Sequence, residues 1–336
     1  MSVVSRQGQW RHFALSLVAA AALIVVTALG VAYVLDPYDT GRSPLVQKPG
    51  VRPQGARTAG ASRARDRAFN AAIFGNSQIQ LLSPERLNAL TGLSFVQLSI
   101  PGSGPEEQLT LIRWFMRHHP DARALVIGVG KNWCTAQPAM PSEHPFPYWL
   151  YSLDPLEYAR GLLRLDVLQE IPRRLGYLFA KRPARASPDG YWDYELNYAA
   201  LGLDHGSAWK ARVNLPIPAS VGDNATGRFP VAKRLRELAS TLSPAVTLAV
   251  VFPPIYARLL PKPGTMAEAA EAACKSAVAG AIAGQPNAVV IDWRRDLPLL
   301  RDAGQFFDLL HYRRPVAEAI EQELGAALTD GARRSF

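Results

Sequence analysis

A serine, a histidine and an aspartate occupy positions in this chain from which they could form a nucleophilic site. Ser77 follows the apolar run 68–74, whereas Asp308 and His311 stand three residues apart, just before the last helical segment. A serine hydroxyl is a weak nucleophile at neutral pH and needs a base, itself oriented by a carboxylate. An isolated Asp-x-x-His is more often a surface turn, so this chemistry depends on the elements that position the three residues.

Short apolar runs alternate with helical patterns after residue 67, which predicts a doubly wound parallel α/β sheet. Five strands are expected, at 68–74, 94–100, 124–129, 246–252 and 288–293. Helices are expected at 105–118, 266–283 and 315–328, and one more begins near Ser83, which precedes a proline as a capping serine does. In open parallel sheets ligands bind outside the carboxyl ends of the strands, so the residues that directly follow each strand are the candidates for chemistry.

Donors for an oxyanion are expected after the first three strands. Ser77 stands at the start of a crossover, where backbone N–H groups point towards a reacting centre. Gly102 lies in a Gly- and Pro-rich turn at 101–105, which lets a backbone N–H approach that centre closely. Asn132 follows the third strand and offers a side-chain amide. Glycine at such turns is also common for steric reasons, so each position is weak evidence alone.

Taken together, these segments resemble the SGNH, or GDSL-type, hydrolase superfamily. The Gly-Asp-Ser turn of the family is matched by Gly-Asn-Ser at 75–77, and its closing Asp-x-x-His by residues 308–311. Gly102 or Gly104 matches the glycine after its second strand. Asn132 is shifted by two positions relative to the third block of the family.

The resemblance implies a flavodoxin-like sheet and an ester-cleaving or acyl-transferring activity. It makes Ser77 the nucleophile, His311 the base and Asp308 the residue that orients the base. It also implies an oxyanion hole formed by the N–H groups of Ser77 and Gly102, with Asn132 as a further donor. No metal and no organic cofactor are implied.

An uncharged apolar run from Phe13 to Leu35 is long enough to cross a bilayer. Its 23 residues correspond to about 34 Å of helix. A secretory signal peptide is the alternative, but its apolar region is usually only about 7–15 residues long. Basic residues on both sides leave the orientation open. We expect a cytoplasmic leader (1–12), an uncleaved single-pass inner-membrane helix (13–35) and an exported, periplasmic body.

The net charge of +9 is concentrated near the N-terminus. Residues 1–67 contribute +6 of it, which leaves a nearly balanced body. Such a body is not typical of a domain that neutralises phosphates, so no nucleic-acid binding is expected. Residues 36–67 are rich in Pro, Gly, Ser and Arg and are predicted to form a flexible basic tether, with arginines that are solvated or contact anionic lipid.

The segment 131–230 does not fit a simple crossover and is predicted to be an insertion in an α/β domain of residues 68–336. It holds 14 of the 30 Phe, Trp and Tyr residues of the chain. These could fill the core of a small helical lid, or offer a platform for sugar rings or an acyl chain. Cys134 and Cys274 lack the spacing of a redox pair and could form one structural disulfide or remain two buried thiols.

One N-terminal membrane helix, an exported body and a closing Asp-x-x-His are together similar to SGNH proteins of the bacterial envelope. We therefore predict a membrane-anchored serine esterase or O-acyltransferase that acts on acyl esters of envelope polysaccharide. The implied partners are that substrate, membrane lipid around the N-terminal helix and a multi-spanning O-acyltransferase. The alternative is a non-catalytic envelope protein that binds polysaccharide or a membrane partner through the aromatic insertion. The acyl group, the glycan, the oligomeric state and the choice between hydrolase and transferase stay open.

Overall fold

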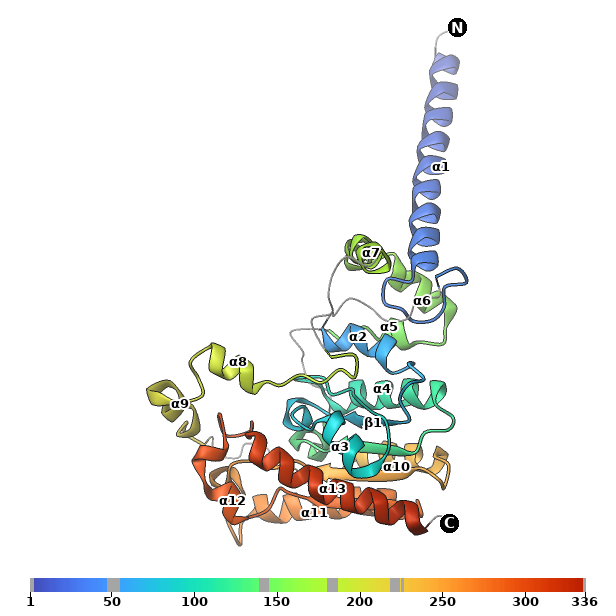
Figure 1. Ribbon diagram of the computed structural model, residues 1–336. Helices are drawn as coiled ribbons and strands as arrows, with labels where there is room; N and C mark the ends of the chain where they lie inside the picture. The colour runs from blue at the N-terminus through green and yellow to red at the C-terminus, as the bar shows by residue number, and fades with distance from the viewer. Residues whose placement is uncertain are drawn as a thin grey trace. The chain divides into compact units, whose positions relative to one another are not determined.

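The computed structural model describes residues 3–46, 55–138, 145–179, 187–217, 224 and 227–334 (Figure 1). The chain folds as two compact units. One contains residues 1–62 and 147–185, and the other contains residues 63–146 and 186–336.

The second unit is built on a five-stranded, all-parallel sheet, as predicted. Its strands are β1 (Ala71–Phe74), β2 (Phe95–Gln97), β3 (Ala124–Gly128), β4 (Thr247–Phe252) and β5 (Ala288–Asp292). They are ordered β2-β1-β3-β4-β5. The order reverses between β1 and β3, which in doubly wound sheets is the crevice where ligands bind. The turns after these two strands therefore lie at the switch point of the sheet.

Helices cover both faces of this sheet. The helices of the unit are α3 (Pro84–Thr91), α4 (Pro105–His118), α8 (Glu195–Ala200), α9 (Gly206–Val213), α10 (Pro230–Thr241), α11 (Met266–Ile282), α12 (Pro298–Arg301) and α13 (Arg314–Arg334). Helix α13 packs against α3, β4 and β5, whereas α10 packs against α4 and α11 (Figure 1). Ile73 belongs to the core beneath α13, and the neighbouring Phe74 contacts Phe115 of α4. Successive residues of a strand point to opposite faces, so the two helix layers lie on opposite sides of the sheet.

The capping signal at Ser83 predicted the start of α3 correctly. The hydroxyl of Ser83 accepts a hydrogen bond from the N–H of Arg86, and Pro84 is the first residue of α3. The described residues of the unit also form four short 3₁₀ helices: η1 (Ser77–Ile79), η2 (Lys131–Cys134), η3 (Ala257–Leu259) and η4 (Ala303–Gln305).

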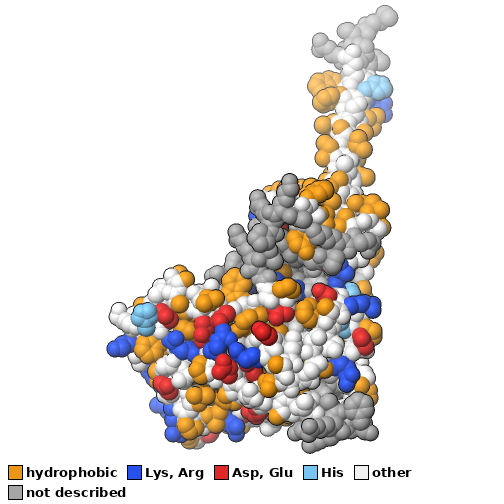
Figure 2. Space-filling view, in the orientation of Figure 1, with side chains coloured by type: hydrophobic (Ala, Val, Ile, Leu, Met, Phe, Trp, Pro, Cys, Tyr) orange, Lys and Arg blue, Asp and Glu red, His pale blue; other side chains and the backbone are white. Residues whose placement is uncertain are grey.

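The first unit is helical. It contains α1 (Val3–Leu35), α2 (Ala56–Arg63), α5 (Tyr148–Tyr151), α6 (Pro155–Leu162) and α7 (Leu165–Leu178). Within α1, the stretch Gly8–Leu35 contains an 18-residue window with a mean hydropathy of 2.5 and is long enough to span a membrane. Figure 2 shows apolar side chains along this helix. The predicted apolar N-terminal helix is thus present, and it begins earlier than residue 13.

The predicted tether, 36–67, differs from a flexible linker in the parts that the structure describes. Both carboxylate oxygens of Asp36 accept hydrogen bonds from backbone N–H groups, those of Thr40 and Gly41, at 2.8 Å. Asp39 accepts a hydrogen bond of 2.6 Å from the hydroxyl of Ser62, in α2. Small residues and buried polar contacts order this segment. Neither gives the sequence an apolar periodicity, so the pattern of the sequence did not reveal this order. Residues 47–54 lie outside the described chain.

The predicted insertion, 131–230, is divided between the two units. Residues 147–179 pack with the N-terminal segment, where Trp149 contacts both Tyr38 and Tyr158 with ring centroids 5.8 Å apart. All three rings are buried, so in this part the aromatic side chains fill a core. Residues 187–217 belong instead to the α/β unit.

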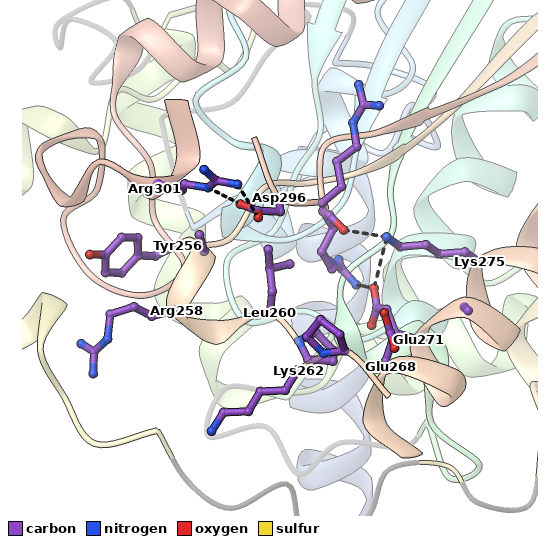
Figure 3. Close-up of a pocket in the computed structure, with 15 residues that line it drawn as sticks. Tyr256, Arg258, Leu260, Lys262, Glu268, Glu271, Lys275, Asp296 and Arg301 are labelled. Carbon is purple, nitrogen blue, oxygen red and sulfur yellow. Dashed lines mark hydrogen bonds and ion pairs between the residues drawn. The ribbon is translucent and has the colours of Figure 1, made fainter. Parts of the chain in front are cut away.

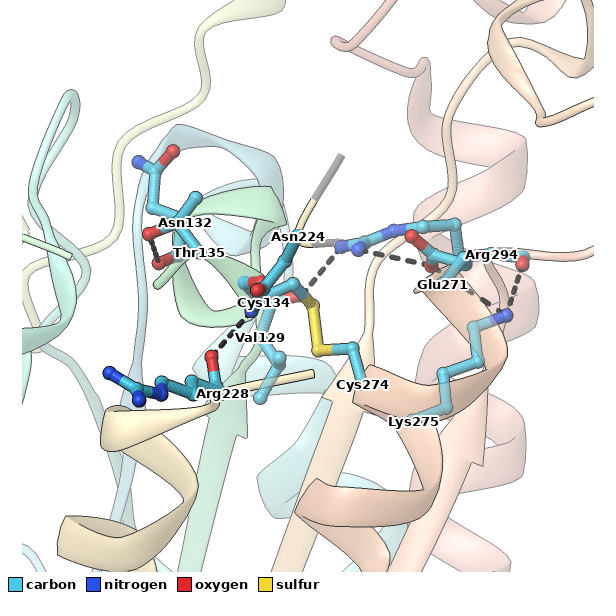
Figure 4. The surroundings of a disulfide bond; sticks show 10 residues. All are labelled: Val129, Asn132, Cys134, Thr135, Asn224, Arg228, Glu271, Cys274, Lys275 and Arg294. Carbon is cyan, nitrogen blue, oxygen red and sulfur yellow. Dashed lines mark hydrogen bonds and ion pairs between the residues drawn. A yellow bond between two sulfur atoms is a disulfide. The ribbon is translucent and has the colours of Figure 1, made fainter. Parts of the chain in front are cut away.

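A disulfide joins Cys134, at the end of η2, to Cys274 in α11 (Figure 4). The Cα atoms are 5.4 Å apart, within the usual range for this bond. Of the alternatives for the two cysteines, the structural disulfide is the one observed. It ties the segment after β3 to the helix between β4 and β5.

Candidate active site

The turn after β1 presents Ser77 at the carboxyl end of the sheet. Gly75 has φ +154°, and a Cβ at this position would lie 2.6 Å from Cγ2 of Ile79, so a larger residue does not fit. Asn76 then caps η1, because its side-chain oxygen accepts a hydrogen bond of 3.0 Å from the N–H of Gln78. Ser77 is the first residue of η1 and is half-buried. A constrained strand-to-helix turn thus orients the serine.

A tight loop between η4 and α13 carries Asp308 and His311. Phe306 and Tyr312 form an antiparallel bridge across it, and the N–H of Phe307 donates to the carbonyl oxygen of His311 at 2.8 Å. The side chains of these three aromatic residues are buried. Inside the loop, Oδ1 of Asp308 accepts a hydrogen bond of 2.8 Å from the N–H of His311. The buried aromatic residues therefore anchor the loop, and the aspartate closes it.

The structure brings Ser77, His311 and Asp308 together, although the serine and the histidine are 234 residues apart. Nε2 of His311 lies 2.9 Å from Oγ of Ser77. Nδ1 of the same ring lies 2.9 Å from Oδ2 and 3.0 Å from Oδ1 of Asp308. These distances match the arrangement of nucleophile, base and orienting carboxylate in serine hydrolases.

The carboxylate determines which nitrogen of His311 carries the proton. An ionised Asp308 can only accept hydrogen bonds, so Nδ1 must be the donor towards it. Nε2 of the neutral ring is then an acceptor and receives the hydroxyl hydrogen of Ser77. The arrangement is therefore set to move a proton from the serine to the imidazole.

Two residues that the sequence did not single out also hold Asp308. The hydroxyl of Tyr198 donates to Oδ2 at 2.8 Å, and Nη2 of Arg212 donates to the same oxygen at 3.0 Å. Both lie in the 187–217 part of the predicted insertion, where no recognisable motif marks them. Only their position in α8 and α9 brings them to the carboxylate.

These contacts keep Asp308 ionised. Burial alone would raise the pKa of this carboxyl group. The hydrogen bond from His311 and the positive charge that its ring carries when protonated, together with hydrogen bonds from the N–H of Leu310 and the hydroxyl of Tyr198, outweigh burial and hold the pKa well below its usual range. The group is therefore a carboxylate at neutral pH, as the orientation of the imidazole requires.

Aromatic rings support the imidazole and its partner. The ring of Tyr198 stacks on Phe307 at 4.3 Å, and the edge-on ring of Tyr194 lies 5.6 Å from His311. The hydroxyl of Tyr194 donates to the carbonyl oxygen of Tyr312 at 2.7 Å. This packing restricts the rotation of His311 and Tyr198.

For any reaction in which Ser77 acts as a nucleophile, the Tyr198→Phe variant is expected to lower kcat about tenfold and to change KM little. It removes a hydrogen bond to a charged group, which is worth about 1.5–3 kcal/mol, while Arg212 still holds the same oxygen. The stacked ring is retained, so folding should be unaffected. Tyr191→Phe is the matched control. It also removes a tyrosine hydroxyl, but that hydroxyl lies 3.5 Å from the carbonyl oxygen of Leu81 and not beside Asp308. Equal kcat values for Tyr198→Phe and the wild type would contradict this role of Tyr198.

The turn after β2 is hydrogen-bonded to the turn that carries Ser77. The hydroxyl of Ser103 donates to the carbonyl oxygen of Gly75 at 3.2 Å, and the N–H of Ile100 donates to the same oxygen at 2.9 Å. Gly102, between them, is exposed and has φ +66°. Gly102 thus lies in a turn attached to the one that carries Ser77, and its oxyanion role stays a prediction.

The segment after β3 approaches the same place through Gly130. A Cβ at Gly130 would lie 2.9 Å from Nδ2 of Asn76, so the two turns touch. Asn132 is half-buried two residues further on, and its carbonyl oxygen accepts a hydrogen bond from Thr135 at 3.1 Å (Figure 4). Among the contacts of the described residues, none joins the side chain of Asn132 to Ser77. Its role as an oxyanion donor also stays a prediction.

A cavity of about 710 Å³ is lined by residues that follow β4 and β5 and by α11 (Figure 3). The N–H of Tyr256, on its wall, donates to the carbonyl oxygen of Leu309 at 3.0 Å, so the cavity adjoins the loop that holds Asp308 and His311. In its lining, Arg301 donates two hydrogen bonds of 2.7 Å to the carboxylate of Asp296. In the part of the chain that the structure describes, no group of three or more His, Cys, Asp or Glu residues is arranged to hold a metal ion.

Comparison of the chain with models of known protein families and with curated protein sequences gives no match.

Proposed function

We propose that the protein is a serine esterase or O-acyltransferase in which Ser77 is the nucleophile. The observation that carries the proposal is the continuous chain of hydrogen-bond distances from Ser77 through His311 to Asp308. In an ordinary solvated surface turn, the aspartate would not need several hydrogen-bond donors. Nor would the histidine need to contact a serine on a different loop. Perturbed, well-oriented groups of this kind are typical of functional sites.

In the first half of the reaction, Oγ of Ser77 attacks the carbonyl carbon of an acyl ester and its proton passes to Nε2 of His311. The bond from that carbon to the alcohol oxygen then breaks, and His311 returns the proton to the departing alcohol. The acyl group is left on Ser77 as an ester. Asp308 stabilises the imidazolium that forms between these two transfers.

In the second half, water or a sugar hydroxyl attacks the acyl-serine and gives its proton to His311. The bond to Oγ breaks, and the proton returns to Ser77. Hydrolysis and transfer differ only in this acceptor. The N–H groups of Ser77 and Gly102, with the amide of Asn132, are proposed to bind the oxyanion in both halves.

The fold proposed for this chemistry is the flavodoxin-like SGNH sheet. The order β2-β1-β3-β4-β5 is consistent with it, as is the position of Ser77 after β1 at the switch point. The Asp-x-x-His segment directly before the last helix agrees with the same family.

We further propose that the α/β unit lies on the periplasmic side of the bacterial inner membrane and acts on acyl esters of envelope polysaccharide. The apolar helix α1 supports attachment to a membrane. The disulfide between Cys134 and Cys274 supports an oxidising compartment, because such bonds are rare in the cytosol. An accompanying multi-spanning O-acyltransferase remains a proposed partner.

The nucleophile can be tested by covalent labelling of the full-length protein in detergent with a fluorophosphonate. One phosphonyl group per chain is expected, and mass spectrometry of peptides should locate it on Ser77, since the activated hydroxyl displaces fluoride. Ser77→Ala and His311→Ala should remain unlabelled, whereas the exposed Ser240→Ala should label like the wild type. A folded wild-type protein that takes up no label would favour the non-catalytic alternative.

A further inference from the structure

Helix α7 buries two of its charged residues and exposes apolar residues on its opposite side. Glu170 and Arg174 are only 8% and 2% exposed. Leu165 and Phe179, by contrast, are 71% and 73% exposed, and Leu168 is exposed between them. These spacings place the apolar residues along one face of the helix. A helix that faces water has the opposite pattern, so this face is adapted to another environment.

More exposed apolar side chains lie in the neighbouring segments. We call this group the α6–α7 surface; its members are Leu153, Leu156, Leu163, Leu165, Leu168 and Phe179, all of them exposed. Single apolar side chains are common on protein surfaces, but large exposed groups of them mark interaction sites. Figure 2 shows apolar side chains around α7 at the foot of α1.

Arg174 places this surface at a defined level along α1. Its Nε donates to the carbonyl oxygen of Leu35 at 3.2 Å, and its Nη2 lies 3.8 Å from Asp39. Leu35 is the last residue of α1 and of the stretch that could span a membrane. A guanidinium at this point also interacts favourably with the C-terminal end of the helix dipole. Helix α7 is therefore attached where α1 would leave the hydrocarbon layer.

Further contacts make this junction rigid. The hydroxyl of Thr40 lies 3.1 Å from that of Tyr158 in α6, and the guanidinium of Arg42 lies 3.9 Å from the centre of the Tyr158 ring. Arg42 also donates to the carbonyl oxygen of Ser152. The chain that leaves α1 is thus held by α6, and the α6–α7 surface keeps its position relative to the end of α1.

We propose that the α6–α7 surface lies in the interface of the same membrane that α1 crosses, with its leucines and Phe179 inserted among lipid headgroups and the first acyl carbons. Helices with one apolar face bind membranes in this way. Arg164 and Arg173 pair with Asp166 and Glu170 but remain solvent-exposed; they flank the apolar face and suit contact with anionic headgroups. Lipid is favoured as the occupant because the surface is continuous with a lipid-facing helix. The proposal is independent of the esterase activity.

The test uses full-length protein in nanodiscs of phosphatidylethanolamine and phosphatidylglycerol. Both native cysteines are in the disulfide, so a single cysteine introduced by Leu165→Cys, Leu168→Cys or Phe179→Cys can be labelled with a fluorophore. Nitroxide-bearing lipid should quench each label severalfold more than it quenches a label at Lys233→Cys, on the exposed side of α10. Aqueous iodide should show the opposite preference.

Because three positions are labelled, the test can still be read if one variant misfolds. Leu165 and Phe179 are highly exposed, so neither substitution removes core packing. Efficient iodide quenching at these sites would overturn the proposal, since the surface would then face water. Protection from both quenchers would also overturn it, because a protein partner or a second copy would then cover the leucines. Only lipid quenching with iodide protection supports it.

Discussion

The Asp308→Asn variant is expected to lose about 10⁴-fold in kcat for hydrolysis of p-nitrophenyl acetate, with little change in KM. The carboxylate accepts a hydrogen bond from Nδ1 of His311 and is held by Tyr198 and Arg212. An asparagine that turns its NH₂ towards the ring would force the proton to Nε2. That tautomer cannot take the proton of Ser77. Steady-state kinetics of the full-length protein in detergent would measure the loss.

The Ser77→Ala and His311→Ala variants should lose at least about 10³-fold, and a double variant should lose no more than either single one, because the residues act as a unit. Asp302→Asn is the matched control. Asp302 lies near the same loop and caps η4 by accepting a hydrogen bond of 2.8 Å from Gly304, a contact that asparagine can also make. Circular dichroism would verify that each variant is folded. Near-wild-type rates in folded Asp308→Asn and Ser77→Ala proteins would exclude the proposed mechanism.

Removal of the disulfide by Cys134→Ala with Cys274→Ala is expected to lower the free energy of unfolding of the α/β unit by about 2–5 kcal/mol. The bond connects residues 140 apart in sequence, so its loss greatly increases the freedom of the unfolded chain. Alanine avoids placing a hydroxyl at the fully buried position 274. Urea unfolding of the variant and the wild type would give the difference.

Reduction of the wild type provides the control for this experiment. Dithiothreitol should shift the wild-type transition to that of the double variant and leave the variant unchanged. Esterase activity below the transition should survive in both, since neither cysteine belongs to the triad. Coincident transitions of the oxidised wild type and the variant would show that the bond adds nothing to stability.

All five strands and four of the helices of the α/β unit could be predicted because their signals are local, whereas α8, α9, α10 and α12 were not predicted. The apolar run 124–129 gave β3 nearly to the residue, and helix α4 has the bounds that were expected. Ser83 caps α3 through a contact between residues three apart in sequence. Patterns of this kind depend on short-range physics and can be recognised without knowledge of the fold.

The candidate triad could be predicted for a related reason. Once the strands are assigned, parallel topology places their carboxyl ends at one edge, and Ser77 follows one of them. Asp308 and His311 are neighbours in sequence, and their mutual contact is local. Only the approach of His311 to Ser77 needed the tertiary structure.

The remaining features depend on contacts between segments far apart in the chain. Tyr198 and Arg212 reach Asp308 from about 100 residues away, and nothing in their own surroundings in sequence marks them. The segment around α2 resembles a linker in composition, yet it is ordered by buried hydrogen bonds such as that of Asp39 with Ser62. Composition records which side chains are available, whereas burial and long-range pairing determine which of them meet. The local pattern of the sequence therefore specified the sheet and the order of its chemical groups, and tertiary packing alone decided the support of the triad, the disulfide and the outward-facing leucines of α7.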